Sequence, residues 1–306
     1  MSNKLNDASR ELNYTYKPVK GTTELYQRME SELGVPYNPF RFWTLLTRVI
    51  PRAVWCMRGQ EEVELRIHSS RLKALKKIVM SNNNLDKNKD DWVSSFEVLC
   101  ASVLLAEWST SDAPRNQQHN LHVACNLRGR SERFSKDYFG NAAFDFCESM
   151  DDVPQKLLQE YTMESLVSLA QLVHSAMRRG LKDAERNACK AKDWYEAARH
   201  LGLKNKHDIW APVVFDVLQG NGTFVNSWDK RFLDCCMGGD DNAKASSMVA
   251  WFGVLQNLFV EVPRHAESGD STIYLALPRA HAKRFGDFCK TTKDDNTYLL
   301  PFEVVA

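Results

Sequence analysis

Residues 63–81, VELRIHSSRLKALKKIVMS, decide the fold class, because two kinds of hydrophobic spacing follow one another there. VELRIHSS (63–70) alternates apolar and polar side chains, which predicts a strand. In SSRLKALKKIVMS (69–81), Leu72, Leu75 and Val79 lie on one stripe of an amphipathic helix. A strand that leads directly into a helix is typical of a layered domain that mixes both kinds of element.

The same mixture continues through the chain. A buried helix is expected at WVSSFEVLCASVLLAEW (92–108), which is apolar almost all round. Residues 153–200 carry two long helical patterns, VPQKLLQEYTMESLVSLAQLVHSAMRRG and DAERNACKAKDWYEAARHLG, the second ending at residue 202. PRAHAKRFGDFCK (278–290) predicts a further helix, with Pro278 at its start.

Strands are expected between these helices. Leu121, Val123, Cys125 and Leu127 alternate with polar or small residues in NLHVACNLRGR (120–130), the period of a strand. YFGNAAFDFC (138–147) predicts a turn that leads into a second strand, and further strands are predicted at MVAWFGVL (248–255), NLFVEVPR (257–264) and TIYLALP (272–278). The last two flank HAESGDS, a hairpin turn. The sequence therefore predicts an α/β or α+β layered domain.

Bulk composition limits the function. The chain has 306 residues, of which 43% are hydrophobic, enough for one large or two medium domains. Its formal net charge of +1 gives no field that favours nucleic acid or an anionic membrane. No apolar run approaches the roughly 20 residues that span a bilayer. The polar first residues lack the apolar core of a signal peptide, so a cytoplasmic protein is expected, with neither nucleic acid nor membrane as partner.

The eight cysteines form no C-x-x-C pair, and most lie in apolar segments, so we expect them reduced and buried. Cys235 and Cys236 draw attention in NSWDKRFLDCCMGGDD (226–241). Adjacent side chains in an extended segment point to opposite sides, as do His119 and His122, so no metal site is expected. A disulfide between the adjacent cysteines would be strained. GGDDNAK (238–244) lacks the spacing of a phosphate-binding loop.

Six segments occur in an order that a known family also shows. They are VELRIHSSRLKALKK, DDWVSSFEVLCASVLLAEW, LHVACNLRGR, DYFGN, NSWDKRFLDCCMGG and STIYLALPRAHAKRF. Together they resemble the C-terminal half of the BAHD-type acyltransferases, and DYFGN (137–141) matches the family's Tyr-Phe-Gly-Asn turn. The resemblance implies an α/β layered domain with a chloramphenicol-acetyltransferase-like fold, in which a mixed sheet is backed by the helices of 90–108 and 153–200. It also implies transfer of an acyl group from an acyl-CoA co-substrate to a small-molecule hydroxyl or amine in secondary metabolism.

The sequence departs from the family in its first part. The family's general base belongs to a His-x-x-x-Asp motif, and none of the eight histidines here is followed by Asp at that spacing. Residues 1–60 resemble only a remnant of the N-terminal domain and the crossover, and 61–306 resemble the C-terminal domain. Three interpretations follow: the base lies on a missing N-terminal domain or a partner chain, the chain is a non-catalytic binding or interaction relative, or the chain is truncated.

The resemblance assigns residues in 226–238. Asn226 and Trp228 correspond to positions near the acyl carbonyl, where side-chain N–H groups can stabilise an oxyanion. The family's Asp-Phe-Gly-Trp-Gly becomes Asp-Cys-Cys-Met-Gly, which keeps Asp234 and Gly238. Asp234 would be structural and pair with Arg128, since either charge alone would be costly to bury.

Four cations in the helix of 69–81 are candidates for binding the phosphates of coenzyme A: Arg71, Lys73, Lys76 and Lys77. The alternative is that they form a solvated helix face, as basic clusters on amphipathic helices usually do.

Overall fold

We describe a computed structural model of the chain. It describes residues 24, 59–82, 92–111, 120–129, 134–137, 143–150, 160–200, 222–227, 258–263, 269–295 and 300–305. The other residues, among them most of the expected remnant domain 1–60 and the expected strand 248–255, lie outside this description.

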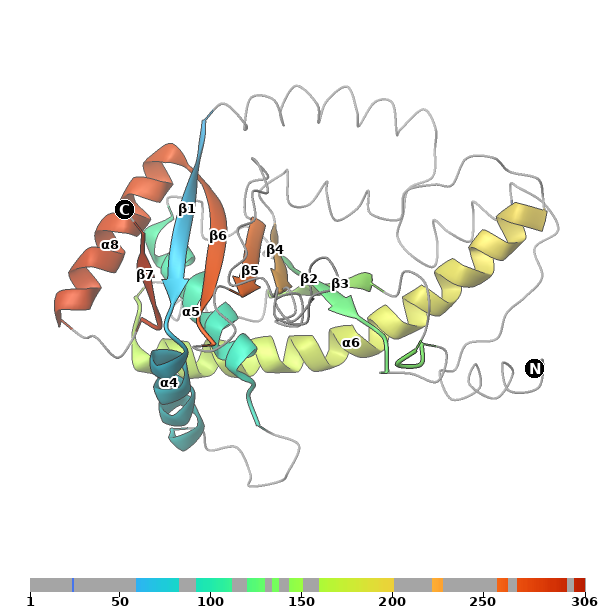
Figure 1. Ribbon diagram of the computed structural model, residues 1–306, viewed down its shortest axis with the longest axis horizontal. Helices are drawn as coiled ribbons and strands as arrows, with labels where there is room; N and C mark the ends of the chain where they lie inside the picture. The colour runs from blue at the N-terminus through green and yellow to red at the C-terminus, as the bar shows by residue number, and fades with distance from the viewer. Residues whose placement is uncertain are drawn as a thin grey trace, which may run out of the picture.

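The described strands form one seven-stranded sheet in the order β3-β2-β4-β5-β6-β1-β7 (Figure 1). The strands are β1 Gln60–Ile67, β2 Asn120–Asn126, β3 Ala143–Ser149, β4 Gly222–Ser227, β5 Leu258–Pro263, β6 Ser271–Pro278 and β7 Phe302–Val304. β4 pairs in parallel with β2 and β5, and the remaining pairs are antiparallel. The prediction of a mixed sheet is confirmed.

The unit that decided the fold class forms as expected. Val63, Leu65 and Ile67 of β1 are buried. α4 (Ser69–Ser81) follows β1 directly and buries the predicted stripe of Leu72, Leu75 and Val79. Next to β1 in the sheet, β6 pairs with the central strand β5 to form the predicted hairpin, with Pro263 opposite Ser271.

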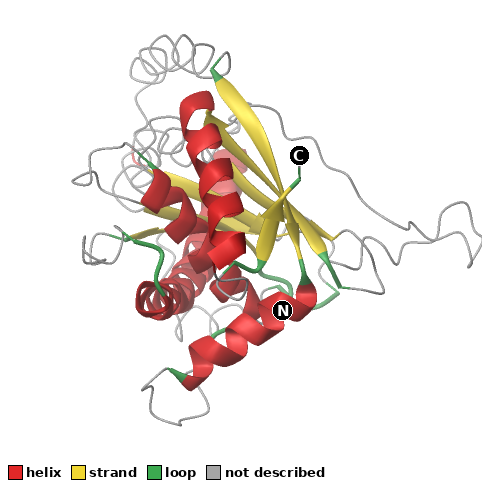
Figure 2. Ribbon diagram, turned by 90° about the vertical axis from the view of Figure 1, so that its left-hand side faces the viewer, coloured by secondary structure: helices red, strands yellow, loops and turns green. Residues whose placement is uncertain are grey.

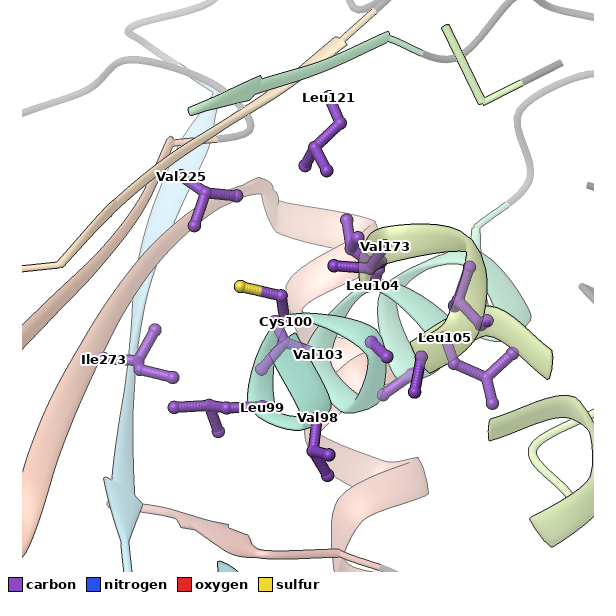
Figure 3. Packing of buried hydrophobic residues seen from close by; sticks show 14 of the residues in the cluster. Val98, Leu99, Cys100, Val103, Leu104, Leu105, Leu121, Val173, Val225 and Ile273 are labelled. Atoms are coloured by element: carbon purple, nitrogen blue, oxygen red, sulfur yellow. The ribbon is translucent and has the colours of Figure 1, made fainter. Parts of the chain in front are cut away.

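α5 (Ser95–Thr110) is the central helix, buried on all sides as its composition predicts. Leu99 and Cys100 face Val225 of β4 and Ile273 of β6 (Figure 3). Its first turn is fixed by a capping box, in which the Ser94 hydroxyl accepts from the Glu97 amide at 3.1 Å. A helix that is apolar all round requires cover on both sides, here the sheet and α6.

α6 (Met163–His200) is one helix of 38 residues that runs along the sheet and past β3 (Figure 1). The prediction of two helices in 153–200 is therefore wrong within the described residues, because the helix continues through Gly180. This glycine serves packing: a Cβ at Gly180 would overlap the ring of Phe146 in β3. The missing side chain thus lets helix and strand approach closely.

α8 (Arg279–Asp295) completes the helical layer. It starts directly after Pro278, the last residue of β6, as the sequence indicates. The described helices α4, α5, α6 and α8 share a single buried apolar cluster with one face of the sheet, and Figure 2 shows helices gathered beside the sheet. That face is called the helix face below.

Candidate active site

The opposite face of the sheet carries the first candidate residue. Val225, Ile273 and Leu65 belong to the cluster on the helix face. Because successive strand residues point to opposite faces, Asn226 lies on the other face. We call it the open face because the described helices pack on the helix face, although Thr272, Tyr274 and Ala276 on it are buried. In the strand registers Asn226 pairs with Val260, Val260 with Tyr274, and Tyr274 with Glu64. These residues form one row across β4, β5, β6 and β1.

Asn226 is the only part of the predicted oxyanion site among the described residues. It is half-buried, at the second-last position of β4, so its amide is held by a paired strand yet accessible. Trp228, Asp234 and Gly238 lie outside the described residues. The roles predicted for these four residues remain predictions.

A carboxylate binds the end of β4 on the helix face. The Ser227 hydroxyl donates to Glu261 Oε2 at 2.7 Å, and the Ser271 hydroxyl donates to Glu261 Oε1 at 2.8 Å. Glu261 thereby joins β4 to β6 across β5. We refer to Ser227, Glu261 and Ser271 as the strand-end clamp.

The β1 end of the open face is acidic. Glu62 and Glu64 lie there, and Glu303 of β7 pairs with Arg66 of β1 at 3.7 Å and with His68 at 3.3 Å. Burial, and then the neighbouring charge of Glu64, raise the pKa of the Glu62 carboxyl.

The four candidate cations of α4 do not converge. At about 100° per residue, Arg71 and Lys76 flank opposite sides of the buried stripe. Both are half-buried, and the Lys76 ammonium lies 4.6 Å from the centre of the Trp92 ring. Lys73 and Lys77 are exposed on the side away from the stripe. The amide of Ser69, at the start of α4, donates to Asp270 at 2.9 Å, so a carboxylate already occupies part of this helix N-terminus.

Arg128 follows β2 and is half-buried. Its backbone amide and its Nη1 donate to Asn126 Oδ1, at 3.1 and 3.3 Å. Its predicted partner Asp234 lies outside the described residues, so the pairing is untested.

Two described histidines have structural partners on the helical side. His174 Nδ1 of α6 lies 3.1 Å from Glu97 Oε1, which ties α6 to the capped start of α5. His281 Nε2 of α8 lies 3.0 Å from the Thr110 hydroxyl and 3.0 Å from the Glu107 carbonyl oxygen. Neither residue shares the face of Asn226, so neither is a candidate general base for chemistry there.

Two negative findings concern the part of the chain that the structure describes. No three His, Cys, Asp or Glu side chains gather there as a metal ion would require. No helix in the same residues is both long enough and apolar enough to cross a membrane.

Comparison with solved structures defines the class of fold. The chain is similar to TRI101 of F. sporotrichioides, complexed with coenzyme A and T-2, with a TM-score of 0.57 and 16% identity over 81% of this chain and 52% of that one. It is similar to TRI101 of F. graminearum, complexed with ethyl coenzyme A, with a TM-score of 0.52 and 14% identity over 81% and 50%. The chain thus spans about half the length of these proteins. At such identities the likeness establishes the fold, that of the BAHD and chloramphenicol-acetyltransferase-like acyltransferases.

The sequence itself gives the family. The family model described as "Transferase family" matches residues 4–290, most of the chain. The protein therefore belongs to this family of BAHD-type acyltransferases, as its six ordered segments indicate. No curated protein matches the chain.

Sequence reasoning missed the strand-end clamp and the strand that positions Asn226. GTFVNS is short and begins at the last glycine of a Gly-Asn-Gly segment, which is typical of turns. Its sequence therefore gives only a weak indication of the strand β4. The sequence contains one indication of the clamp. In NLFVEVP, Glu261 comes two positions after Phe259, so strand alternation places its carboxylate on the same face of the sheet as this apolar residue.

Proposed function

We propose that the protein takes part in the transfer of an acyl group from an acyl-CoA to a hydroxyl or amine of a small molecule. The observation that carries the proposal is the family match across residues 4–290. It is supported by two structures of similar fold that hold coenzyme A or ethyl coenzyme A. One of them also holds T-2, a small molecule of the kind an acceptor would be.

The chemistry would be centred over the end of β4. The acceptor oxygen or nitrogen attacks the thioester carbonyl carbon, and the carbonyl oxygen becomes an oxyanion. Asn226 Nδ2 is proposed to donate to that oxyanion, and Trp228 is proposed to assist. Collapse of the tetrahedral intermediate breaks the carbon–sulfur bond and releases coenzyme A as a thiolate. A base takes the acceptor proton, which finally protonates the thiolate.

The base is proposed to lie outside these 306 residues, on a further domain or a partner chain, because the sequence has no His-x-x-x-Asp. Asp234, Gly238 and Arg128 would maintain the loop after β4. Lys73 and Lys77, exposed on α4, remain candidates to meet the phosphates of coenzyme A.

A second candidate function is a relative that binds acyl-CoA, or a protein partner, without turnover. The same missing motif favours it, together with the altered sequence at 234–238. Acyl transfer and acyl-CoA binding without turnover both require a nucleotide-thioester site, and these two differ in whether product forms. Binding of a protein partner alone requires no such site.

The experiment combines calorimetry with a thiol assay. Acetyl-CoA is titrated into the purified chain, and release of free thiol is then followed with a panel of alcohols and amines. Binding with acceptor-dependent thiol release supports transfer, whereas binding without release supports the second candidate. Absence of binding for both acetyl-CoA and longer acyl-CoAs contradicts both.

Asn226→Ala probes the oxyanion role, with Asn82→Ala, an exposed residue after α4, as the matched control. Loss of one oxyanion donor costs about 10²–10³ in kcat in well-studied enzymes. Unchanged turnover in Asn226→Ala would remove this residue from the site.

A further inference from the structure

The strand-end clamp lies at the end of β4, one residue before Trp228 in the sequence. Ser227 is the last residue of β4, and its hydroxyl bonds to Glu261 of β5. Ser271, the buried first residue of β6, bonds to the other carboxylate oxygen. Hydrogen bonds to an ionised acceptor are stronger than neutral ones, so Glu261 of β5 adds a side-chain link between the end of β4 and the start of β6. The Ser227 half of this link is exposed, and the Ser271 half is partly buried.

A neighbouring hydrogen bond connects the clamp region to the start of α4. Asp270, which precedes Ser271, accepts the backbone amide of Ser69 at the start of α4. On the helical side, burial raises the pKa of the Cys100 thiol, and the charge of Glu261 raises it further, so this carboxylate is close to α5. Glu261 thus fixes the end of β4 to β6 and lies beside the central helix.

The clamp has a geometric consequence for Asn226. Side chains alternate between faces along a strand, so fixing the Ser227 side chain on the helix face directs Asn226 to the open face. A strand end can twist or fray, because it lacks the ladder beyond it. A side-chain bond at the last residue opposes both movements directly next to the proposed oxyanion donor.

We propose that Glu261 is a positioning residue for Asn226: through Ser227 it fixes the face and the angle at which the Asn226 amide is presented. The proposal rests on the proposed function in assigning Asn226 a role toward the acyl-CoA. It adds a residue that touches neither substrate nor the reacting atoms and acts from the opposite face of the sheet.

Hydrogen exchange tests the structural half of the proposal without any ligand. Glu261→Ala is expected to speed exchange of the amides in 222–227 on the order of tenfold, while β1 amides in 60–67 keep their rates. Glu261→Gln should largely restore protection, because its amide can accept from one serine hydroxyl and donate to the other. Equal exchange of 222–227 in wild type and Glu261→Ala would overturn the proposal.

Ser227→Ala provides the same test if Glu261→Ala does not fold. Ser81→Ala is the matched control, since the Ser81 hydroxyl makes a single bond, to the Ile78 carbonyl in α4, far along the chain from β4. If Ser81→Ala changed the exchange rates of the amides in 222–227 as much as Ser227→Ala does, that result would also contradict the clamp.

A double-mutant cycle with Asn226→Ala tests the functional half, with the dissociation constant of acetyl-CoA as the measured quantity. Glu261→Ala is expected to weaken binding several-fold when Asn226 is present and to have no further effect in Asn226→Ala. An equal effect in both backgrounds would show that Glu261 does not act through Asn226. If wild type binds no acyl-CoA, the proposed function fails, while the exchange result still decides whether the clamp holds β4.

Discussion

Asn226 and Ser227 are consecutive residues of β4 that lie on opposite faces of the sheet. Ser227 bonds to Glu261 on the helix face, and Asn226 shares the open face with Tyr274. On the helix face Ser227 is thus tied to β5, and the other face carries the Asn226 amide one residue earlier in the chain. Asn226 on one face is therefore the proposed oxyanion donor, and Glu261 on the other face is the residue proposed to position it.

The packing of α5 gives the first prediction. Leu99 is fully buried against the sheet (Figure 3), so Leu99→Ala should lower the free energy of unfolding by about 2–5 kcal/mol. Chemical denaturation measures the change. Lys77→Ala on the exposed side of α4 is the control and should stay within about 0.5 kcal/mol of wild type. Equal stability of the two variants would contradict the central position of α5.

Two helical glycines should respond in opposite directions to alanine. Gly180→Ala is expected to destabilise the protein because the new methyl group overlaps the Phe146 ring. Gly286→Ala in α8 should stabilise by about 0.5–1 kcal/mol, since a Cβ there meets no atom within 4 Å.

A cycle with Phe146→Ala isolates the cause of the Gly180 effect, because the smaller side chain removes the overlap. The cost of Gly180→Ala should then shrink. A cost that is unchanged in the Phe146→Ala background would show that the close approach of α6 and β3 is not responsible.

Glu107 should make the stability of the protein depend on pH. Burial in α5 raises the pKa of this carboxyl from 4.5 to about 8. The folded state therefore holds the proton more tightly than the unfolded state, and the stability gained is complete below about pH 4.5. It is lost progressively as the pH rises to about 8, because the unfolded carboxyl ionises first.

Glu107→Gln should remove this part of the pH dependence and should be more stable than wild type near pH 8, by an amount that urea unfolding between pH 5 and 9 can measure. Glu61→Gln, at an exposed position of β1, is the matched control and should follow wild type. If wild type and Glu107→Gln show parallel profiles, the carboxyl is not buried in neutral form.

The capping box of α5 gives a local test. The Ser94 hydroxyl accepts a hydrogen bond from the Glu97 amide, and the Glu97 carboxylate accepts one from the Ser94 amide at 2.5 Å. Ser94→Ala should cost about 1 kcal/mol, with Ser109→Ala near the other end of α5 as a control that removes one bond to a carbonyl. A smaller loss for Ser94→Ala than for Ser109→Ala would contradict the cap.

Local sequence patterns predicted the elements whose hydrophobic spacing can be recognised within one short stretch of the chain. The strand and helix of 63–81, the all-apolar α5 and the β5–β6 hairpin were all visible in this way. The continuity of α6 was not, because Gly180 appears as a helix end unless its neighbour Phe146, 34 positions earlier in the chain, is known. The clamp was hidden for the same reason: Ser227 and Glu261 are separated by 34 positions and meet only through the parallel pairing of β4 and β5.

The central claim is that the protein provides a coenzyme A site, and calorimetric titration with coenzyme A itself tests it most directly. Coenzyme A is the part that every acyl donor shares, so the identity of the acyl group does not affect the result. We predict saturable one-site binding in the range of about 1 μM–1 mM that acetyl-CoA competes for. No heat of binding and no change in melting temperature at about 1 mM coenzyme A would contradict the claim.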